Sequence, residues 1–299
     1  GNRLYLQEDK FLNYKIPVPS VSKQNQIITA YNLLLNRAAN LENEAINLEK
    51  DLQKFVFDSL GIKKKEKSVS SSLLNTVRFQ NIQQWGYDKI AIDFPYSFEK
   101  YKSHSLSSNP NWLKEIYRGK SPEYQPHGKR IILNQKCNRT NEIDLKYAKT
   151  VNEKWFSKIP SDQLTQTGDI MINSTGEGTL GRASLIISDK HVGLAFDSHM
   201  LLLRVNPNEI DSLLFVYLFN SPLGQTQVDL YKSAQATKQT ELGIENTKRI
   251  RFPLPNLAIQ KSISNLIKKE TLQISKLREE ASGLYEKAKI EFEEAIFGE

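Results

Sequence analysis

Positively charged side chains gather in two neighbouring stretches of the chain, with hydroxyls and an aromatic ring in residues 118–124 and interleaved with amides in residues 128–139. Arginine and lysine can contact phosphates or guanine edges, while asparagine and glutamine can pair with adenine edges. This mixture predicts contacts with nucleic acid. The candidate contact residues are Arg118, Lys120, Lys129, Arg130 and Lys136, with Asn134 and Gln135 as possible base readers.

A glycine-rich segment from Asn173 to Arg182 (NSTGEGTLGR) joins two predicted strands and carries hydroxyl groups and an arginine. Glycines let backbone N–H groups approach an oxygen closely, so Asn173, as a possible base reader, and Arg182 join the candidate contacts. An equally simple interpretation is a tight hairpin whose glycines only supply positive φ. The polar stretch 233–240 adds Lys238 and Gln239, either as contacts or as parts of a solvated loop.

Catalytic signatures are absent from the sequence. It contains no phosphate-binding loop motif, no dinucleotide-binding motif after a strand and no HExxH motif. The histidines are dispersed, the segment 109–112 is interpreted as a turn, and Cys137 as a structural thiol. We therefore expect no catalytic residue, no metal site and no cofactor.

The composition fits a globular protein with an anionic partner. Of 299 residues, 41 are Lys or Arg and 34 are Asp or Glu, which gives a net charge of +7. This balance favours nucleic acid over a membrane surface, although many basic proteins bind neither. No apolar run is long enough to span a membrane. A single cysteine indicates a reducing compartment, so we expect a cytoplasmic protein.

An internal repeat organises the chain. Residues 16–28 (IPVPSVSKQNQII) match residues 252–264 (FPLPNLAIQKSIS) at two prolines, a glutamine and an isoleucine. Each copy leads into a long helical pattern that ends at a glycine, Gly61 or Gly298. The prolines come just before each predicted helix, where a missing N–H does no harm. We expect helices over 23–60 and about 258–297.

Both predicted helices carry apolar residues at alternating spacings of three and four, as the seam of a coiled coil does. Two seams of equal length in one chain pack most economically against each other, and antiparallel packing lets the intervening segment leave and return at one end. Pairing of each seam with a separate chain is the alternative. The expected seam includes Leu34, Leu41, Leu48, Leu52, Phe55, Ile274, Leu277 and Leu284.

The middle of the chain has short β-rich runs divided by Gly, Pro, Asn and Asp. Strands are expected at 130–135, 168–175, 182–187 and 199–206, and a helix at 210–222 that stops at Asn-Ser-Pro. The expected organisation is a tail and proline turn (1–21), a first helix (22–61), a linker (62–73), an α+β domain (74–246), and a second proline turn and helix (247–299).

This order of features resembles the specificity subunit of type I restriction–modification systems. The likeness rests on the two proline turns and helices, on GDIMINSTGEGTLGRASLI, and on SAQATKQTELGIENTKRIRFPLP. It implies an α+β DNA target-recognition domain inserted between two long helices that pair as an antiparallel coiled coil. It also implies a non-catalytic reader of one half of a bipartite double-stranded DNA target, with helices that dock methyltransferase and restriction subunits.

The family holds two recognition domains apart on two helices, whereas this sequence has one domain between its repeats. Residues 1–15 resemble the end of another such domain, so the chain resembles the second half of a subunit, and two copies could associate as a homodimer. Two alternatives stay open. One is the C-terminal specificity region of a fused restriction–methylation enzyme, and the other is a helical scaffold whose basic insert binds a protein or RNA.

Overall fold

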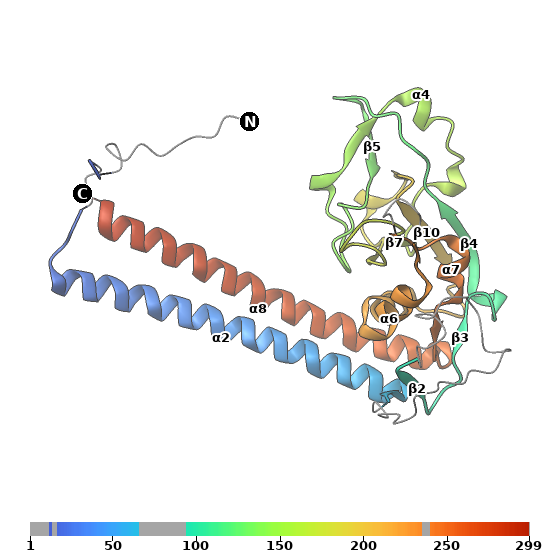
Figure 1. Cartoon of the computed structure of the whole chain (residues 1–299), viewed down its shortest axis with the longest axis horizontal. Helices are drawn as coiled ribbons and strands as arrows, with labels where there is room; N and C mark the ends of the chain where they lie inside the picture. Colours follow the sequence, from blue (N-terminus) through green and yellow to red (C-terminus); the bar gives the residue numbers. More distant parts are fainter. Residues whose placement is uncertain (1–11, 14–16, 66–93, 235–239, 299) are drawn as a thin grey trace, which may run out of the picture. The chain divides into compact units, whose positions relative to one another are not determined.

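The computed structural model describes residues 12–13, 17–65, 94–234 and 240–298 (Figure 1). The expected tail at 1–11, the linker residues 66–73, the start of the middle domain at 74–93, and Lys238 and Gln239 lie outside these ranges. The chain divides into two compact units. The first comprises Gly1–Leu52 with Lys268–Glu299, and the second comprises Gln53–Ile267.

The first unit is a pair of antiparallel helices. Helix α2 runs from Val21 to Leu60 and helix α8 from Leu257 to Phe297, so both continue into the second unit. Arg37 forms an ion pair with Glu280 (3.1 Å). The rings of Tyr31 and Phe292 lie 5.1 Å apart. Earlier residues of α2 thus contact later residues of α8, which confirms the predicted antiparallel pair (Figure 1).

Small residues form the tightest part of the helical seam. Ala38, Ala45 and Ala281 are fully buried, and Ala288 is nearly so. The other expected seam residues flank them. Leu52 and Ile274 are buried, and five leucines are partly buried, namely Leu34, Leu41, Leu48, Leu277 and Leu284. Alanine has no side chain beyond Cβ, so the helix axes can approach closely at these positions.

The expected seam is wrong at its end. Phe55 is 46% exposed, and the neighbouring Val56 is fully buried instead. The buried positions Leu52 and Val56 are four residues apart, so the spacing does not return to three as a strict heptad requires. An α-helix has 3.6 residues per turn, and its apolar stripe therefore drifts from a 3.5-residue repeat.

The repeated glutamine has the same local role in both copies. The Gln24 side chain donates to the Pro19 carbonyl at 2.8 Å, and the Gln260 side chain donates to the Pro255 carbonyl at 2.8 Å. Each glutamine therefore fixes the proline turn to the first turn of its helix. In the second unit Gln260 also donates to the Glu209 carbonyl and accepts from the Asp211 N–H, so it joins helix α8 to the segment before helix α5.

A four-stranded antiparallel sheet forms the centre of the second unit. Its order is β4 (Leu113–Arg118), β10 (Met200–Val205), β7 (Ile170–Asn173) and β8 (Ala183–Leu185). Every residue of β7 is buried, and so is every residue of β10 except Arg204. The strands predicted within 168–175, 182–187 and 199–206 are therefore confirmed.

Two helices follow the sheet. Helix α5 (Ser212–Asn220) confirms the helix expected over 210–222, and Ser221 ends it. Pro222, expected only as a stop, also occupies the first turn of a further helix, α6 (Pro222–Tyr231). Proline suits this position because its fixed φ and missing N–H cost nothing in a first turn.

A smaller mixed sheet has the order β6 (Lys149–Val151), β5 (Arg130–Leu133) and β9 (Ala195–Phe196), with the short helix α4 (Glu153–Phe156) after β6. Strand β5 confirms the strand expected over 130–135. Ile132, Val151, Trp155 and Ala195 form its core, and Leu133 and Phe196 belong to the adjoining core with Met171 and Leu202 of the central sheet.

Short strand pairs complete the second unit. They are β1 (Ile62–Lys64) with β2 (Tyr96–Phe98), β3 (His104–Ser105) with β13 (Arg251–Phe252), and β11 (Ser233–Ala234) with β12 (Thr240–Glu241), and helix α7 (Ile244–Arg249) precedes β13. Residues 62–64 were expected in a linker and are instead a strand. Ile62 is 3% exposed, and its burial stabilises this pairing.

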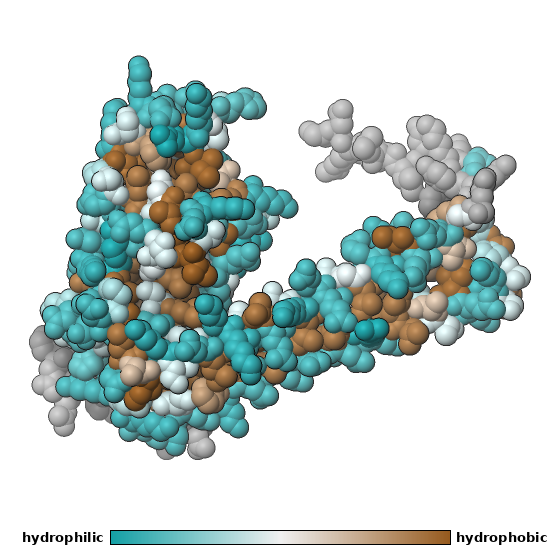
Figure 2. Space-filling model, turned by 180° about the vertical axis from the view of Figure 1, so that it is seen from behind, coloured by the Kyte–Doolittle hydropathy of each residue, from teal (hydrophilic) through white to brown (hydrophobic). Residues whose placement is uncertain are grey.

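Several large apolar side chains are exposed on the helices, among them Ile28, Leu33, Leu272 and Ile290. Figure 2 shows hydrophobic patches among hydrophilic residues along the two helices. None of the described helices combines the length and apolar character that a membrane crossing requires.

Candidate nucleic-acid interface

The glycine-rich segment is a tight turn between β7 and β8. Gly176, Gly178 and Gly181 have φ of 105°, 72° and 73°. The Gly181 N–H donates to the Asn173 carbonyl, and the Asn173 N–H donates to the Arg182 carbonyl. The hairpin interpretation is therefore right about the glycines, because each adopts a positive φ that other residues rarely take.

This turn also forms one wall of a cavity of about 730 Å³ in the second unit. We call it the turn pocket. Most of its lining residues have polar side chains, among them the cationic Lys232 and the acidic Glu177 and Asp229. The lining residues are Gln135, Thr175, Gly176, Glu177, Gly178, Leu180, His199, Gln225, Asp229, Lys232 and Thr240.

Three buried polar atoms at the turn have no hydrogen-bond partner in the part of the chain that the structure describes. They are Oε1 of Gln135, Oδ1 of Asn173 and Oγ of Ser174. Folded proteins pair the large majority of buried polar atoms, because an unpaired one loses its hydration without replacement. The backbone N–H groups of Gly176, Glu177 and Gly178 likewise donate to no acceptor in the described structure. Unused hydrogen-bonding capacity is thus concentrated at this turn.

Two of the expected base readers point inward. Asn134 is 5% exposed, donates to the Tyr147 carbonyl (2.6 Å) and accepts from the Lys136 N–H (2.9 Å). Asn173 is fully buried and donates to the Gln135 carbonyl (3.0 Å). These side chains shape the backbone and do not face solvent, unlike the exposed base readers that were expected. Gln135, by contrast, lines the turn pocket.

The six expected cations fall into two groups. Lys120, Lys129 and Lys136 are exposed, and no acidic side chain of the described residues forms an ion pair with them. The arginines are engaged within the protein: Arg118 pairs with Glu241, Arg130 with Glu153 (3.0 Å), and Arg182 donates to the Asn138 carbonyl (3.1 Å). The lysines are therefore the freer phosphate contacts.

The structure adds cation–aromatic pairs that were not predicted. The Lys149 ammonium lies 4.4 Å from the centre of the Tyr124 ring, and Tyr124 is 47% exposed. Arg139 and Lys146 lie 4.8 and 5.8 Å from the centre of the Tyr147 ring. The alternation of lysine and tyrosine in residues 144–149 was the available signal. An exposed ring beside a cation, such as Tyr124, can stack on a base or sugar.

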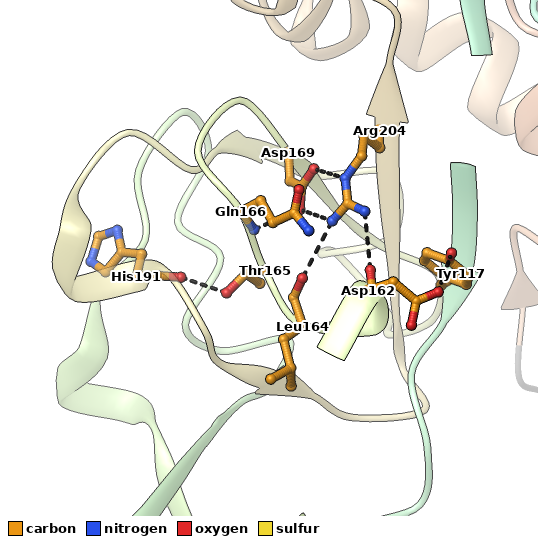
Figure 3. Close-up of polar contacts among 8 residues, drawn as sticks. All are labelled: Tyr117, Asp162, Leu164, Thr165, Gln166, Asp169, His191 and Arg204. Atoms are coloured by element: carbon orange, nitrogen blue, oxygen red, sulfur yellow. Dashed lines mark hydrogen bonds and ion pairs between the residues drawn. The ribbon is translucent and has the colours of Figure 1, made fainter. Parts of the chain in front are cut away.

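A second polar cluster in the same unit is fully engaged (Figure 3). We call it the Arg204 network. The Arg204 guanidinium makes two 2.8 Å contacts with the Asp169 carboxylate and donates to the carbonyls of Asp162 and Leu164. The Tyr117 hydroxyl donates to Asp162 at 3.0 Å. Desolvation and this hydrogen bond raise the pKa of Tyr117 to about 12.

The remaining reactive groups fit structural roles. Cys137 is buried and free, and burial raises the pKa of its thiol above the ordinary value, which lowers its reactivity. Within the described ranges, no three His, Cys, Asp or Glu side chains gather in a way that would hold a metal ion.

The family model described as "Type I restriction modification DNA specificity domain" matches residues 115–281, which is more than half of the chain. The chain belongs to this family. The matched range includes the turn pocket, Lys120, Lys129, Lys136 and the first part of helix α8. The residues matched to the DNA specificity domain thus include Gln135, Asn173 and Ser174, whose buried side-chain oxygens are unpaired.

One of the solved structures compared has a TM-score above 0.5 and shares the fold. It comes from a structure described as the "structural basis underlying complex assembly and conformational transition of the type I R-M system". The two chains superpose with a TM-score of 0.53 and 13% identity, over 98% of this chain and 64% of that one. The chain is also similar to the HsdS subunit of Thermoanaerobacter tengcongensis, with a TM-score of 0.45 and 12% identity over 99% of this chain and 64% of that one. Its TM-score to the type I restriction-modification S subunit of M. genitalium is 0.49, with 13% identity over 93% of this chain and 61% of that one.

This chain therefore spans less than two thirds of the length of these solved chains. No match was found among curated protein sequences.

Proposed function

We propose that the chain reads one half of a bipartite double-stranded DNA target as part of a type I specificity subunit. The observation that carries this proposal is the turn pocket with its unpaired Gln135 side-chain oxygen, beside the unpaired atoms of Asn173 and Ser174, all inside the family's DNA specificity domain. A protein surface that leaves donors and acceptors unpaired is suited to a partner that presents the complementary groups, and base edges present both.

Lysines supply the general attraction to DNA in this proposal. Lys120, Lys129 and Lys136 are exposed and unpaired within the described structure, so each can approach a phosphate without breaking an internal ion pair. Arg118, Arg130 and Arg182 are secondary contacts, because each would first have to give up a partner. Phosphate contacts position a protein on the duplex but carry no sequence information directly.

The long helices serve as a docking platform for methyltransferase and restriction subunits in this proposal. Their seam is filled by alanines and leucines, while Ile28, Leu33, Leu272 and Ile290 remain exposed on other faces. Exposed large apolar side chains on a paired helix are suited to further helices of a partner. The chain itself carries no catalysis, and methyl transfer and cleavage belong to the partners, in the cytoplasm where the target DNA lies. A second copy of the chain is a further possible partner.

The salt dependence of duplex binding tests the DNA proposal. Each phosphate contact contributes a slope of about −0.9 to the plot of log K against log salt. We expect the triple variant Lys120→Ala, Lys129→Ala, Lys136→Ala to weaken binding to all duplexes alike and to reduce the slope by up to about 2.7, three times the single-contact value. The affinity is measured between about 50 and 200 mM salt.

A matched triple variant on helix α8 controls for net charge. Lys268→Ala, Lys276→Ala and Lys289→Ala remove three exposed lysines from the helical pair. We expect this variant to keep the wild-type slope. Equal slopes for all three proteins would place the DNA on another surface, and flat binding across the salt range would contradict the electrostatic proposal.

A further inference from the structure

The backbone at Gln135, a residue that lines the turn pocket, is held in place by its neighbours. It follows strand β5 after Asn134, whose side chain ties the segment to the Tyr147 carbonyl and the Lys136 N–H. The carbonyl of Gln135 itself accepts from the Asn173 side chain at 3.0 Å. The backbone at Gln135 is therefore fixed before any ligand arrives.

The side chain of Gln135 lies over the glycine turn. A Cβ at Gly176 would lie 2.5 Å from Oε1 of Gln135 and 2.5 Å from Oγ1 of Thr179, so an alanine there would force these side chains to shift. The same oxygen is buried and accepts no hydrogen bond from the described residues. The position thus combines an immobilised backbone, a close glycine and an unpaired acceptor.

Gln225 provides an internal comparison, because it lines the same pocket. Its amide nitrogen donates to the carbonyls of Gly181 (3.0 Å) and Phe219 (2.9 Å). The structure therefore uses Gln225 to hold helix α6 against the turn. Gln135 makes no such bond with its side chain among the described residues. Of these two glutamines in one cavity, only Gln225 uses its side chain in hydrogen bonds with the described residues, and the side-chain oxygen of Gln135 stays unpaired.

We infer that Gln135 determines base specificity in this domain, that the base it reads is adenine, and that Asn173 is its positioning residue. The inference rests on the proposed function. A primary amide places one donor and one acceptor side by side, which matches the N7 acceptor and N6 donor of adenine in the major groove. A residue that reads a base needs supporting contacts that fix its geometry, and the Asn173 bond to the Gln135 carbonyl is such a contact.

Selection of duplexes from a randomised library by the 299-residue chain tests this inference. The wild-type chain should retain a sequence with a preference for adenine at one or more positions. We expect Gln135→Ala to lose the preference at one A·T pair, to keep the others, and to bind the wild-type sequence about 5- to 150-fold more weakly. We expect Gln135→Glu, which has the same shape, to disfavour adenine there and to gain cytosine, since a carboxylate accepts from cytosine N4.

A pair of glycine variants tests the same position without touching Gln135. Gly176 and Gly178 both have positive φ, so alanine is strained at either. Only the Cβ of alanine at 176 meets Gln135, whereas a Cβ at 178 has no atom within 4 Å. We expect Gly176→Ala to lose the same base preference as Gln135→Ala, and Gly178→Ala to keep it. The melting temperature of each variant reports whether it is folded.

The outcomes separate the two proposals. Gln166, an exposed glutamine beside the Arg204 network, is the matched control, and Gln166→Ala should retain the wild-type sequence and affinity. If both Gln135 variants keep the full wild-type preference, this inference is overturned while sequence-specific binding stands. If the wild-type chain retains no preferred sequence at all, the proposed function fails and the inference fails with it.

Discussion

The two ends of strand β7 treat buried polar groups in opposite ways. Asp169 precedes the strand, and both of its carboxylate oxygens contact Arg204 at 2.8 Å. Asn173 ends the strand, and its Oδ1 has no partner in the described structure. The buried carboxylate at the first end has all its hydrogen bonds without a ligand, whereas the buried amide oxygen at the second end has none. Asp169 and Asn173 are both buried, so a difference in solvent exposure does not explain the difference in hydrogen bonding.

This contrast distinguishes a structural polar cluster from a binding one. The Arg204 network joins β10 and the start of β7 to the segment around Asp162 and Leu164, and its guanidinium has a partner on each side. A buried network of this kind stabilises one arrangement of the chain when every member is satisfied. The turn pocket has glycines, the unpaired side-chain oxygen of Gln135 and free N–H groups, which can be satisfied by an incoming base or phosphate.

The largest expected effect is at Asp169. Asp169→Ala leaves the partly buried Arg204 charge without its carboxylate, which should lower the free energy of unfolding by about 3–5 kcal/mol. Chemical denaturation measures this change. Base selectivity of the folded variant should be unchanged, since the turn is not altered. Asp189→Ala, at an exposed aspartate, is the control and should have little effect. A loss of selectivity in folded Asp169→Ala would contradict the division between the two ends.

A smaller effect is expected from pH at Tyr117. Its pKa is raised from 10.0 to about 12 in the folded protein. The stability that this shift contributes is fully present below pH 10 and is lost as the pH rises toward 12, because the unfolded chain releases the proton first. The free energy of unfolding should therefore fall more steeply above pH 10 in the wild type than in Tyr117→Phe. Parallel curves for the two proteins would show that Tyr117 does not titrate in this way.

The smallest effect on stability is expected at Asn173. Asn173→Ala removes a hydrogen bond to the Gln135 carbonyl and also an unpaired buried oxygen, so the losses and gains partly offset. We expect a change of about 0.5–1.5 kcal/mol in the free energy of unfolding. Base selectivity should nevertheless fall, because Gln135 is no longer held. Full selectivity in this variant would show that Asn173 does not position Gln135.

Periodicity explains why the helices and central strands could be predicted. The repeat of proline and glutamine at Pro19 and Gln24, and again at Pro255 and Gln260, marks the same hydrogen bond in both copies. The β-rich runs have clear turn residues at their ends. Helix α6 was missed because Pro222 was taken as the end of a helix, whereas the same residue also suits the first turn of the next one.

The candidate site could be predicted only in part. The residue types at 128–139 and 173–182 indicate nucleic-acid contact, but they do not show which amides face inward. Asn134 and Gln135 are adjacent, yet Asn134 is bound to the Tyr147 carbonyl and Gln135 lines the pocket. That difference is set by contacts between segments distant in sequence. The choice between Phe55 and Val56 in the seam likewise depends on the drift of a real helix from the heptad.

Hydrogen–deuterium exchange with and without the selected duplex tests the central claim most directly. The N–H groups of Gly176, Glu177 and Gly178 have no acceptor within the described structure, so they should exchange rapidly in the free protein. We predict that bound DNA slows exchange over 173–182 and 128–139 and leaves 161–169, at the Arg204 network, unchanged. Protection of 161–169 with no change in the glycine turn would contradict the account, because DNA would then bind at the end of strand β7 that is already complete.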